Sequence, residues 1–552
     1  MLYFIMYGWF EVSCVLLYQT NAMNEGLSRR NFLTKIGVLT GAAWPGMMAL
    51  GMLKAAPVHP LQLDGNGKGK KVIILGAGLA GMAAAYELMK LGYECIILEA
   101  RERAGGRVFS IRKGAVTEEV QHGKATADFD EGIYYNAGPS RIPHHHFLTL
   151  HYCKELGIPL QVYNNTNESA YFFSEGAGSL SNKKIRKREI HNDMRGYMAE
   201  LLCKAIDTKQ LDTTLTKEDG EKLLEYLRAE GGLNIDDLYK ASARRGYIEQ
   251  PGAGEKAGKI ADPHKLADII ASGLASPEFY NVAEYIYELQ ATMFQAIGGN
   301  DMIAKAFEKK VSSCIKFNTE VTAIKNITEG VQVTYKNKGI ENEMQADFCI
   351  CTIPLPVLSN IDHNFTSDVS RAIDKIVYIP TGKMGMQFKR RFWEEDEMIY
   401  GGITHTNNIL YQLFYPSNDY LGKKGLLITY YNFNDRAKAI GEMSYREREK
   451  IAYEKGVLIH PQYQQDYDHK YFSVSWHKTK YSMGGWGIYS EEERQTLYKK
   501  LLTPDKQVYF AGEHLTYLNG WMAGALESAR TVITALHARA TGQRVSYPSV
   551  SA

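Results

Sequence analysis

The stretch 70–107 constrains the fold more than any other part of the chain, because it has the pattern of a strand, a glycine-rich turn, a helix and a second strand. The apolar run 72–75 is suited to a buried parallel strand, and 82–91 has the composition of a helix. The turn between them carries a G-x-G-x-x-G pattern, with glycines at Gly76, Gly78 and Gly81. Glycines at this spacing let backbone amides and the positive end of a helix approach a pyrophosphate. The stretch therefore predicts a Rossmann-like α/β domain that binds a dinucleotide.

An acidic residue stands at the end of the second predicted strand, 94–98. Glu99 lies 18 residues after Gly81, where a carboxylate can accept hydrogen bonds from a ribose diol. The residues of this unit that we expect to contact the dinucleotide are Gly76, Gly78, Leu79, Ala80, Gly81, Glu99, Ala100 and Arg101.

The sequence after Glu99 indicates which dinucleotide is bound. It reads E-A-R-E-R-A-G-G-R up to Arg107 and resembles a signature of the flavin-containing amine oxidase family. In that family a glycine and an arginine, here Gly106 and Arg107, lie along the pyrophosphate of FAD. The alternative is a charged surface loop after a nicotinamide-type strand, and the C-terminal part of the chain argues against it.

That C-terminal part, 508–529, resembles the closing motif of the same family. The resemblance implies that Gly512 and Glu513 contact the ribityl-phosphate region of FAD. It also implies that a helix starts beside the flavin ring and runs to His537, with ring contacts from Gly520, Trp521 and Met522. In the middle of the chain, 317–321 places Val321 at the adenine. The resemblance spans roughly 68–541 and is thin from about 170 to 280.

The segment 136–143, N-A-G-P-S-R-I-P, resembles the stretch that holds the substrate carboxylate in L-amino acid oxidases of the family. Arg141 falls on their carboxylate-binding arginine, and a bidentate guanidinium suits a carboxylate. The alternative is a surface arginine in a loop. The segment is also expected to contact the cofactor, through Gly138, Pro139, Ser140 and Arg141.

Further substrate contacts are implied by the same resemblance. Tyr378 falls where L-amino acid oxidases place a tyrosine on the substrate carboxylate, although it could equally be a core tyrosine. The carbonyl of Gly520 would receive the amine, and Trp521 would form a wall of the pocket. Trp486 is a candidate for the facing wall or for a buried core residue.

Two departures from the family pattern concern the flavin. Many members carry a lysine near flavin N5 after the strand end I-P-x-x-x-L, and 353–364 contains none, which makes oxygen reactivity less secure. Monoamine oxidases attach the flavin through a cysteine near the position of Met483, and no cysteine follows Cys351. We therefore expect FAD to be bound noncovalently.

The motifs divide the chain into interleaved parts. The FAD-binding domain is expected from 70–136, 294–356 and 500–541, and a mixed-sheet substrate domain from 137–179 and 357–499. A helical insertion, 180–293, is expected to contain amphipathic helices at 218–230, 263–272 and 284–294. Strands are expected at 385–388, 408–414 and 426–431.

Composition narrows the function classes. Lys and Arg number 64 against 62 Asp and Glu, for a net charge of +2 without a basic stripe, so nucleic-acid binding has no support. The scattered cysteines, among them Cys95, Cys349 and Cys351, are expected to be small buried residues rather than a disulfide framework. Three adjacent histidines, 144–146, cannot all face one ion from a regular element, and no metal site is predicted.

The N-terminal segment resembles a targeting signal. Residues 28–35, S-R-R-N-F-L-T-K, are similar to the twin-arginine export signal, and the apolar stretch 36–53 follows. Residues 1–60 are therefore set apart from the fold. A chance arginine pair is the alternative. Met23 is the better candidate for the true start, and Ala55-Ala56 is a poor cleavage site.

These resemblances imply that the chain is an FAD-dependent L-amino acid oxidase. They also imply that it is exported and is periplasmic or secreted, and the alternative is a protein anchored in the membrane by an uncleaved signal. Its substrates would be an L-amino acid and O2, its products a 2-oxo acid, ammonia and H2O2. No catalytic side chain is assigned, because flavin N5 takes the hydride. Other partners would be the twin-arginine export machinery and a second copy in a homodimer. The alternatives are a monoamine or polyamine oxidase, and a catalytically idle flavin-binding protein.

Overall fold

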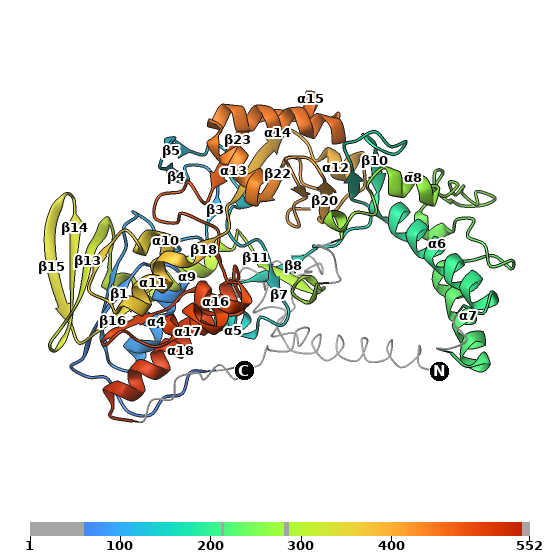
Figure 1. The fold of residues 1–552 in the computed structure, drawn as a ribbon. Coiled ribbons are helices and arrows are strands. Elements are labelled where there is room, and N and C mark those ends of the chain that lie inside the picture. The colour runs from blue at the N-terminus through green and yellow to red at the C-terminus, as the bar shows by residue number, and fades with distance from the viewer. Residues whose placement is uncertain (1–59, 211–214, 281–285, 544–552) are drawn as a thin grey trace, which may run out of the picture.

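The computed structural model describes residues 60–210, 215–280 and 286–543. Figure 1 shows two sheet-containing regions, with a helical arm that extends to one side. The export-signal prediction, the start at Met23 and the cleavage site at Ala55-Ala56 fall outside the described residues.

The first region is built on a five-stranded parallel sheet. Its strands, in the order in which they lie side by side, are β12 (Ile315–Lys316), β2 (Glu94–Leu98), β1 (Lys71–Leu75), β16 (Phe348–Cys351) and β25 (Val508–Phe510). Val72 lies opposite both Cys95 and Phe348 in the ladders. The sheet therefore joins segments that are more than 400 residues apart in the chain.

Helices and a second sheet cover the two faces of this parallel sheet. One face packs on α4 (Leu79–Lys90), α9 (Asp301–Val311) and α18 (Met522–Ala540), through a core that includes Ile74, Phe307 and Leu526. The other face packs on α11 (Ser367–Lys375), on α17 (Leu497–Leu502) and on a four-stranded sheet. That sheet has the order β15 (Ile340–Ala346), β14 (Gly330–Asn337), β13 (Thr319–Ile327) and β17 (Asp362–His363). Alanines and a glycine in the first turns of α4 allow the close packing that a buried helix needs.

The second region is a seven-stranded mixed sheet. Its order is β10 (Lys184–Arg186), β9 (Tyr171–Phe173), β20 (Ile403–Thr406), β21 (Gln412–Phe414), β22 (Gly425–Phe433), β19 (Thr381–Phe388) and β23 (Tyr467–Ser475). All neighbouring strands are antiparallel except β9 and β20. The fold is thus α/β, with a parallel Rossmann-like sheet and a mixed sheet.

Smaller elements complete the description. The remaining α-helices are α5 (Phe147–Glu155), α6 (Lys187–Asp207), α7 (Lys217–Gly231), α8 (Leu266–Ala271), α10 (Leu355–Leu358), α12 (Phe392–Glu395), α13 (Asn434–Glu442), α14 (Tyr445–Ile459), α15 (Tyr463–Asp466) and α16 (Glu491–Gln495). Two-stranded pairs form between β3 (Ser110–Ile111) and β6 (Tyr135–Asn136), β4 (Val116–Glu119) and β5 (Gly123–Thr126), and β18 (Val377–Tyr378) and β24 (Gly487–Ile488).

The predicted helix at 284–294 is wrong. Residues 286–294 contain a short 3₁₀ turn at Tyr287–Leu289 and then enter β11 (Met293–Ala296). This strand pairs on one side with β7 (Ile142–Pro143) and on the other with β8 (Leu160–Tyr163). Long-range pairing with two strands therefore outweighs the local helical pattern.

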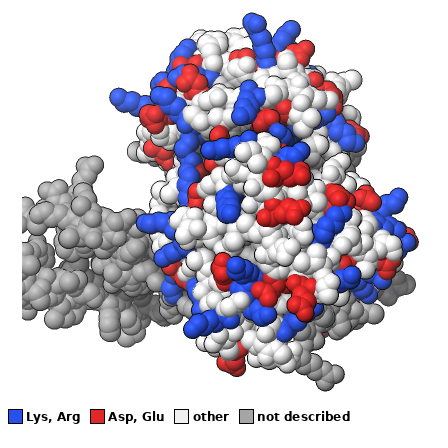
Figure 2. Space-filling view, turned by 90° about the vertical axis from the view of Figure 1, so that its left-hand side faces the viewer, with Lys and Arg blue, Asp and Glu red and all other residues white. Residues whose placement is uncertain are grey.

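Charges of both signs are distributed over the surface. Figure 2 shows Lys and Arg side chains interspersed with Asp and Glu on one face, without a broad single-sign patch. Within the described residues, no helix combines the length and the apolar character that a membrane crossing requires.

Candidate active site

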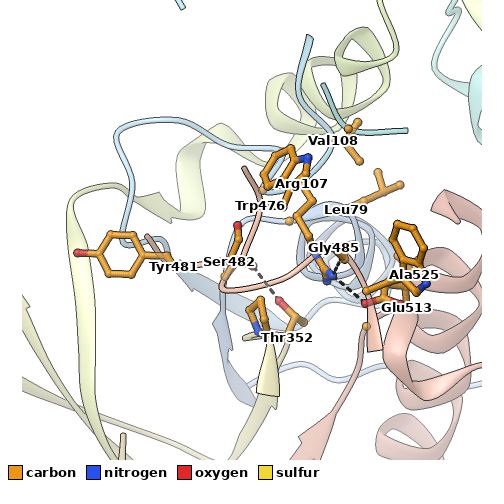
Figure 3. Close-up of a pocket in the computed structure, with 18 of the residues that line it drawn as sticks. Leu79, Arg107, Val108, Thr352, Trp476, Tyr481, Ser482, Gly485, Glu513 and Ala525 are labelled. Atoms are coloured by element: carbon orange, nitrogen blue, oxygen red, sulfur yellow. Dashed lines mark hydrogen bonds and ion pairs between the residues drawn. The ribbon is translucent and has the colours of Figure 1, made fainter. Parts of the chain in front are cut away.

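A cavity of about 590 Å³ lies where the two sheet regions meet. Its wall on the parallel-sheet side comes from the glycine turn after β1, the end of β2 and the start of α18. The opposite wall comes from β19, β21 and β22 of the mixed sheet. Figure 3 shows labelled residues around this space that come from α4, from the segment after β2, from the loop after β23 and from α18.

The glycine turn has the geometry of a dinucleotide cradle. Gly76 has φ +101°, a left-handed conformation that favours glycine. A Cβ on Gly81 would lie 2.1 Å from the carbonyl oxygen of Gly76, so only glycine permits this contact between helix and strand. A Cβ on Gly78 would meet no protein atom within 4 Å. Gly78 therefore faces open space in the cavity, as an approach to a pyrophosphate requires.

Glu99 is held at the end of β2 by backbone amides. Its carboxylate accepts hydrogen bonds from Ala77 N at 2.8 Å and from Arg101 N at 2.9 Å. The side chain is buried and lines the cavity. Arg101 extends past it and donates to the Ser482 hydroxyl at 2.8 Å. These contacts orient the carboxylate at the position where a ribose would lie.

An ion pair joins the stretch 99–107 to the C-terminal stretch 508–529. Arg107 Nη1 donates to Glu513 Oε1 at 2.8 Å and to the Gly485 carbonyl at 2.6 Å (Figure 3). The second carboxylate oxygen of Glu513 accepts from Gly520 N at 3.1 Å. Burial acts to lower the pKa of Arg107, but the Glu513 carboxylate outweighs it, so the pKa is raised and the guanidinium stays charged.

Arg141 is the cation of the opposite wall. Its Nη1 donates to Asn165 Oδ1 at 2.7 Å, and the guanidinium lies 5.7 Å from the centre of the Phe414 ring. Among the described residues, Arg141 forms no ion pair with a carboxylate. Burial raises the pKa of Tyr163 and of Tyr431 to about 12, although the nearby Arg141 charge acts to lower both. Both tyrosines therefore remain neutral hydrogen-bonding groups close to this cation.

Lys383, in β19, is a second basic side chain in the cavity. Its Nζ donates to the Gly138 carbonyl at 2.6 Å, the Ser140 hydroxyl at 2.8 Å and the Asn136 carbonyl at 3.2 Å. Burial, followed by the charge of Arg141, lowers the pKa of Lys383 well below its usual range. No carboxylate among the described residues forms an ion pair with it. Lys383 is thus suited to exchange a proton inside the cavity.

A lysine lines this cavity although 353–364 carries none. That segment does approach the cavity, through residues such as Val357 and Asn360, and it carries no lysine. The lysine of the cavity instead comes from β19, a strand of the other sheet.

Tyr378 is not where the sequence comparison placed it. Its side chain is buried in the core beneath the four-stranded sheet, and its hydroxyl accepts from Leu355 N at 3.3 Å. It does not line the cavity, and the guanidinium next to its ring is that of Arg107, at 5.6 Å. Burial, followed by the nearby Glu513 charge, raises its pKa. A role on a carboxylate held by Arg141 is therefore unsupported, because the intervening packing keeps this hydroxyl in the core.

The structure brings almost all other predicted residues to the cavity. Gly81 is an exception, since it serves the contact between helix and strand described above. The indole of Trp486 packs over Gly520, and that of Trp521 lies against His146. The predicted residues that line the cavity are Gly76, Gly78, Leu79, Ala80, Glu99, Ala100, Arg101, Gly106, Arg107, Gly138, Pro139, Ser140, Arg141, Val321, Trp486, Gly512, Glu513, Gly520, Trp521 and Met522.

Sequence analysis missed several lining residues of the mixed sheet. They are Lys383, Gln412, Phe414, Tyr431, Phe433 and Trp476. Gln412 and Phe414 alternate along one strand, as do Tyr431 and Phe433 along the next. This alternation could have predicted that the two residues of each pair lie on the same face of their strand. It could not have shown which face of the sheet borders the cavity.

The residues present fit a bound FAD. The cradle of Gly76 and Gly78 would receive a pyrophosphate and Glu99 a ribose, and the start of α18 lies in the wall of the same cavity. The described residues contain no group of three or more His, Cys, Asp or Glu side chains that could hold a metal ion.

Comparisons with known proteins agree with this geometry. The family model described as flavin containing amine oxidoreductase matches residues 79–536. The L-amino-acid oxidase of Crotalus adamanteus is 26% identical over 477 residues, which cover 84% of this chain and 86% of that protein. The L-amino-acid oxidase of Bothrops pauloensis is 25% identical over 482 residues, covering 85% and 89%.

Solved structures share the fold at lower sequence identity. Wild-type putrescine oxidase bound to putrescine has a TM-score of 0.54 at 16% identity, covering 86% of this chain and 99% of that one. Cyclohexylamine oxidase from Brevibacterium oxydans has a TM-score of 0.54 at 15% identity, covering 85% and 99%.

Proposed function

The chain belongs to the flavin-containing amine oxidoreductase family, and within that family we propose that it is an FAD-dependent L-amino acid oxidase. Membership implies FAD, a substrate with an amino group, and O2. The observation that carries the finer proposal is Arg141, a cation in the cavity wall without a carboxylate partner among the described residues. A substrate α-carboxylate would supply that partner through charge-assisted hydrogen bonds. A simple amine would leave the cation unmatched.

The other end of the substrate would lie near the start of α18. We place the amino group at the carbonyl of Gly520, between the indoles of Trp486 and Trp521. Gly520 is held on both sides, because its own N–H donates to Glu513 and the Trp521 N–H, which shares a peptide unit with the Gly520 carbonyl, donates to the Leu518 carbonyl at 3.4 Å. Two anchors, one for each charged group, would orient Cα toward the cofactor.

Lys383 provides a proton acceptor close to both anchors. The substrate amine must lose a proton before its Cα–H bond can be oxidised, and Lys383 Nζ can take that proton. When a carboxylate neutralises Arg141, one of the causes that depress the pKa of Lys383 is removed. The lysine therefore becomes a better base as the substrate binds. Bound FAD supplies the oxidation itself, with O2 as the final acceptor, and hydrolysis of the imine gives a 2-oxo acid and ammonia.

Flavin reduction under argon tests the proposal. An L-amino acid and its decarboxylated amine are mixed separately with the holoenzyme, and the loss of flavin absorbance is followed by stopped flow. We expect rapid reduction by at least one L-amino acid and much slower reduction by the matching amine. Faster reduction by the amine would favour a monoamine or polyamine oxidase. A flavin that no member of the panel reduces would indicate an idle flavin-binding protein.

We propose that the FAD is noncovalent, because no cysteine follows Cys351 in the chain. Acid precipitation should release yellow flavin into the supernatant. Flavin that stays with the precipitated protein would contradict this proposal.

We also propose export by the twin-arginine route, on the basis of residues 28–35. Replacing Arg29 and Arg30 by lysine should leave folded, flavin-loaded protein in the cytoplasm. An unchanged distribution between compartments would show that the arginine pair is accidental.

A further inference from the structure

A polar group without a partner lies in the cavity wall, on the same strand as Phe414. Gln412 is 2% exposed and lines the cavity, yet its side-chain amide forms no hydrogen bond with any described residue. Side-chain amides with so little exposure are almost always hydrogen-bonded, and the polar atoms of this one are open to the cavity rather than enclosed in the core. The amide therefore indicates a missing hydrogen-bonding partner inside the cavity.

A second such group stands beside it. His405 lies directly opposite Gln412 in the antiparallel ladder between β20 and β21, so both side chains point to the same face of the sheet. His405 is also 2% exposed, and both of its ring nitrogens are buried without a hydrogen-bond partner. His405 thus lies beside Gln412 in the sheet, although only Gln412 is among the residues that line the cavity.

The electrostatics of this end disfavour a cationic ligand. Burial lowers the pKa of His405 well below its usual range, and the charges that lower it further come from Lys187, His191 and Arg141. His191 is itself within 2.9 Å of the Glu168 carboxylate. The charges that act on the imidazole itself belong to basic residues, so a neutral or anionic acceptor is favoured there over a cation.

The position relative to Arg141 assigns this end to the substrate side chain. Phe414 lies between Arg141 and Gln412. The Arg141 guanidinium lies over the Phe414 ring, and Gln412 is the next residue on the same face of β21. A substrate anchored by its carboxylate at Arg141 can therefore direct its side chain along β21 toward the amide. The aromatic residues Phe433, Trp486 and Trp521 lie toward the other end, near Gly520.

We infer that Gln412, with His405 beside it, forms a subsite that selects L-amino acids whose side chain ends in a carboxylate or carboxamide. This inference rests on the proposed amino acid oxidase function and names its substrate class. The Gln412 amide donates from Nε2 to the terminal oxygen of the substrate side chain. Neutral His405 lies beside Gln412 and not among the lining residues, so the partner open to its ring nitrogen is the amide oxygen of Gln412.

The test compares nearly isosteric substrates. L-glutamate, L-glutamine, L-methionine and L-phenylalanine are each given to the holoenzyme, and kcat/KM is measured by H2O2 release. We expect L-glutamate or L-glutamine to exceed L-methionine by roughly 10- to 100-fold, as one buried hydrogen bond allows. The ratio of L-glutamate to L-glutamine distinguishes an anionic from an amide-terminated side chain.

Gln412→Leu should remove this preference while leaving the rate with L-methionine unchanged or higher. Phe414→Leu is the matched control, because it alters the same wall without a polar group and should affect L-glutamine and L-methionine alike. Gln412→Met serves if Gln412→Leu does not fold. Flavin content and thermal unfolding are measured for every variant.

Binding gives a readout that does not depend on turnover. The 2-oxo acid that corresponds to glutamate should bind the wild-type holoenzyme more tightly than the one that corresponds to methionine, as measured by titration calorimetry. Gln412→Leu should bring the two dissociation constants together.

Three outcomes would overturn the inference. The first is a wild-type preference for L-methionine or L-phenylalanine over both polar substrates. The second is a Gln412→Leu variant that loses equal activity on all four, which would assign the amide to the α-carboxylate. The third is a Gln412→Leu variant that retains the polar preference. Flavin that no amino acid reduces would instead contradict the proposed function, so the two failures are distinguishable.

Discussion

The two walls of the cavity differ in how their polar groups are satisfied. On the parallel-sheet wall, Glu99 accepts from two backbone amides, and Arg107 and Glu513 hold each other. On the mixed-sheet wall, the Gln412 amide has no hydrogen bond with a described residue, and Arg141, which comes from the segment before β7 and lies over Phe414 of that wall, has no carboxylate partner among the described residues. One wall is complete within the protein, whereas the other requires a ligand to complete it.

This difference shows how the two walls contribute to binding. The parallel-sheet wall is organised in advance, so little reorganisation accompanies cofactor binding. The mixed-sheet wall carries unmatched polar groups, whose cost is removed only when complementary substrate groups arrive. Selectivity among substrates should therefore arise mainly on the mixed-sheet wall, since a poorly matched substrate leaves those groups unpaired.

The largest expected effect, loss of the cofactor and with it of all activity, tests the completeness of the first wall through two glycines. In Gly81→Ala the new Cβ would lie 2.1 Å from the Gly76 carbonyl oxygen, so α4 must move away from β1. We expect the free energy of unfolding to fall by roughly 1–3 kcal/mol or more, with loss of flavin. Thermal unfolding and the flavin-to-protein ratio measure these effects.

Gly78→Ala is the matched control, because its Cβ would meet no protein atom within 4 Å. The apoprotein should unfold as the wild type does, but flavin affinity should drop because the methyl group enters the space of the pyrophosphate. Normal flavin binding by Gly78→Ala would show that the cofactor does not approach this turn.

The next prediction tests whether the mixed-sheet wall recognises the substrate carboxylate through Arg141. Arg141→Met should raise KM for amino acids by roughly 10²–10³, from about 3–4 kcal/mol of lost pairing. Flavin content should remain normal, since the arginine contacts no group of the first wall in the described structure. Steady-state kinetics on an amino acid and its decarboxylated amine provide the measurement. Equal losses on both would refute carboxylate recognition.

The contrast between the walls also explains what the sequence could predict. Gly81 and Glu99 belong to a motif whose spacing is fixed by close backbone contacts, so the parallel-sheet wall was recognisable from the residues alone. Arg141 could be predicted because it follows directly on a segment that also lines the cofactor cavity.

The mixed-sheet wall was harder to predict because its residues come from separate strands without fixed spacing. Lys383 reaches the cavity because β19 pairs with β22 and β23, and this long-range pairing cannot be read from the residues around it. Tyr378 lies only five residues earlier but in a different, two-stranded pair, so it enters the core instead. Which face of a strand meets a ligand is decided by long-range pairing.

A smaller effect is expected at Lys383. Its Nζ contacts three hydrogen-bond acceptors but forms no ion pair with a described residue. Since burial and the charge of Arg141 lower its pKa, the free amine is more populated at a given pH than in an ordinary lysine, and it protonates as the pH falls. The rate of flavin reduction should therefore decrease toward acidic pH. Lys383→Met should lower the rate by roughly 10²-fold near pH 7 and remove the ionisation that belongs to the lysine. An unaltered pH profile of reduction in the variant would exclude Lys383 as the proton acceptor.

The smallest effect is expected for Ser140, whose hydroxyl contacts Lys383. It tests whether this hydroxyl helps to set the pKa of the lysine. The three hydrogens of a protonated Lys383 match three acceptors, namely the Asn136 and Gly138 carbonyls and the Ser140 hydroxyl. Ser140→Ala leaves two acceptors, which match the two N–H groups of a neutral amine. The pKa of Lys383 should therefore fall further, and the acidic limb of the reduction rate should move to lower pH by up to about one unit, the value of one hydrogen bond. Flavin content and KM should change little. A limb that moves to higher pH would show that the hydroxyl instead stabilises the neutral amine by donating to it.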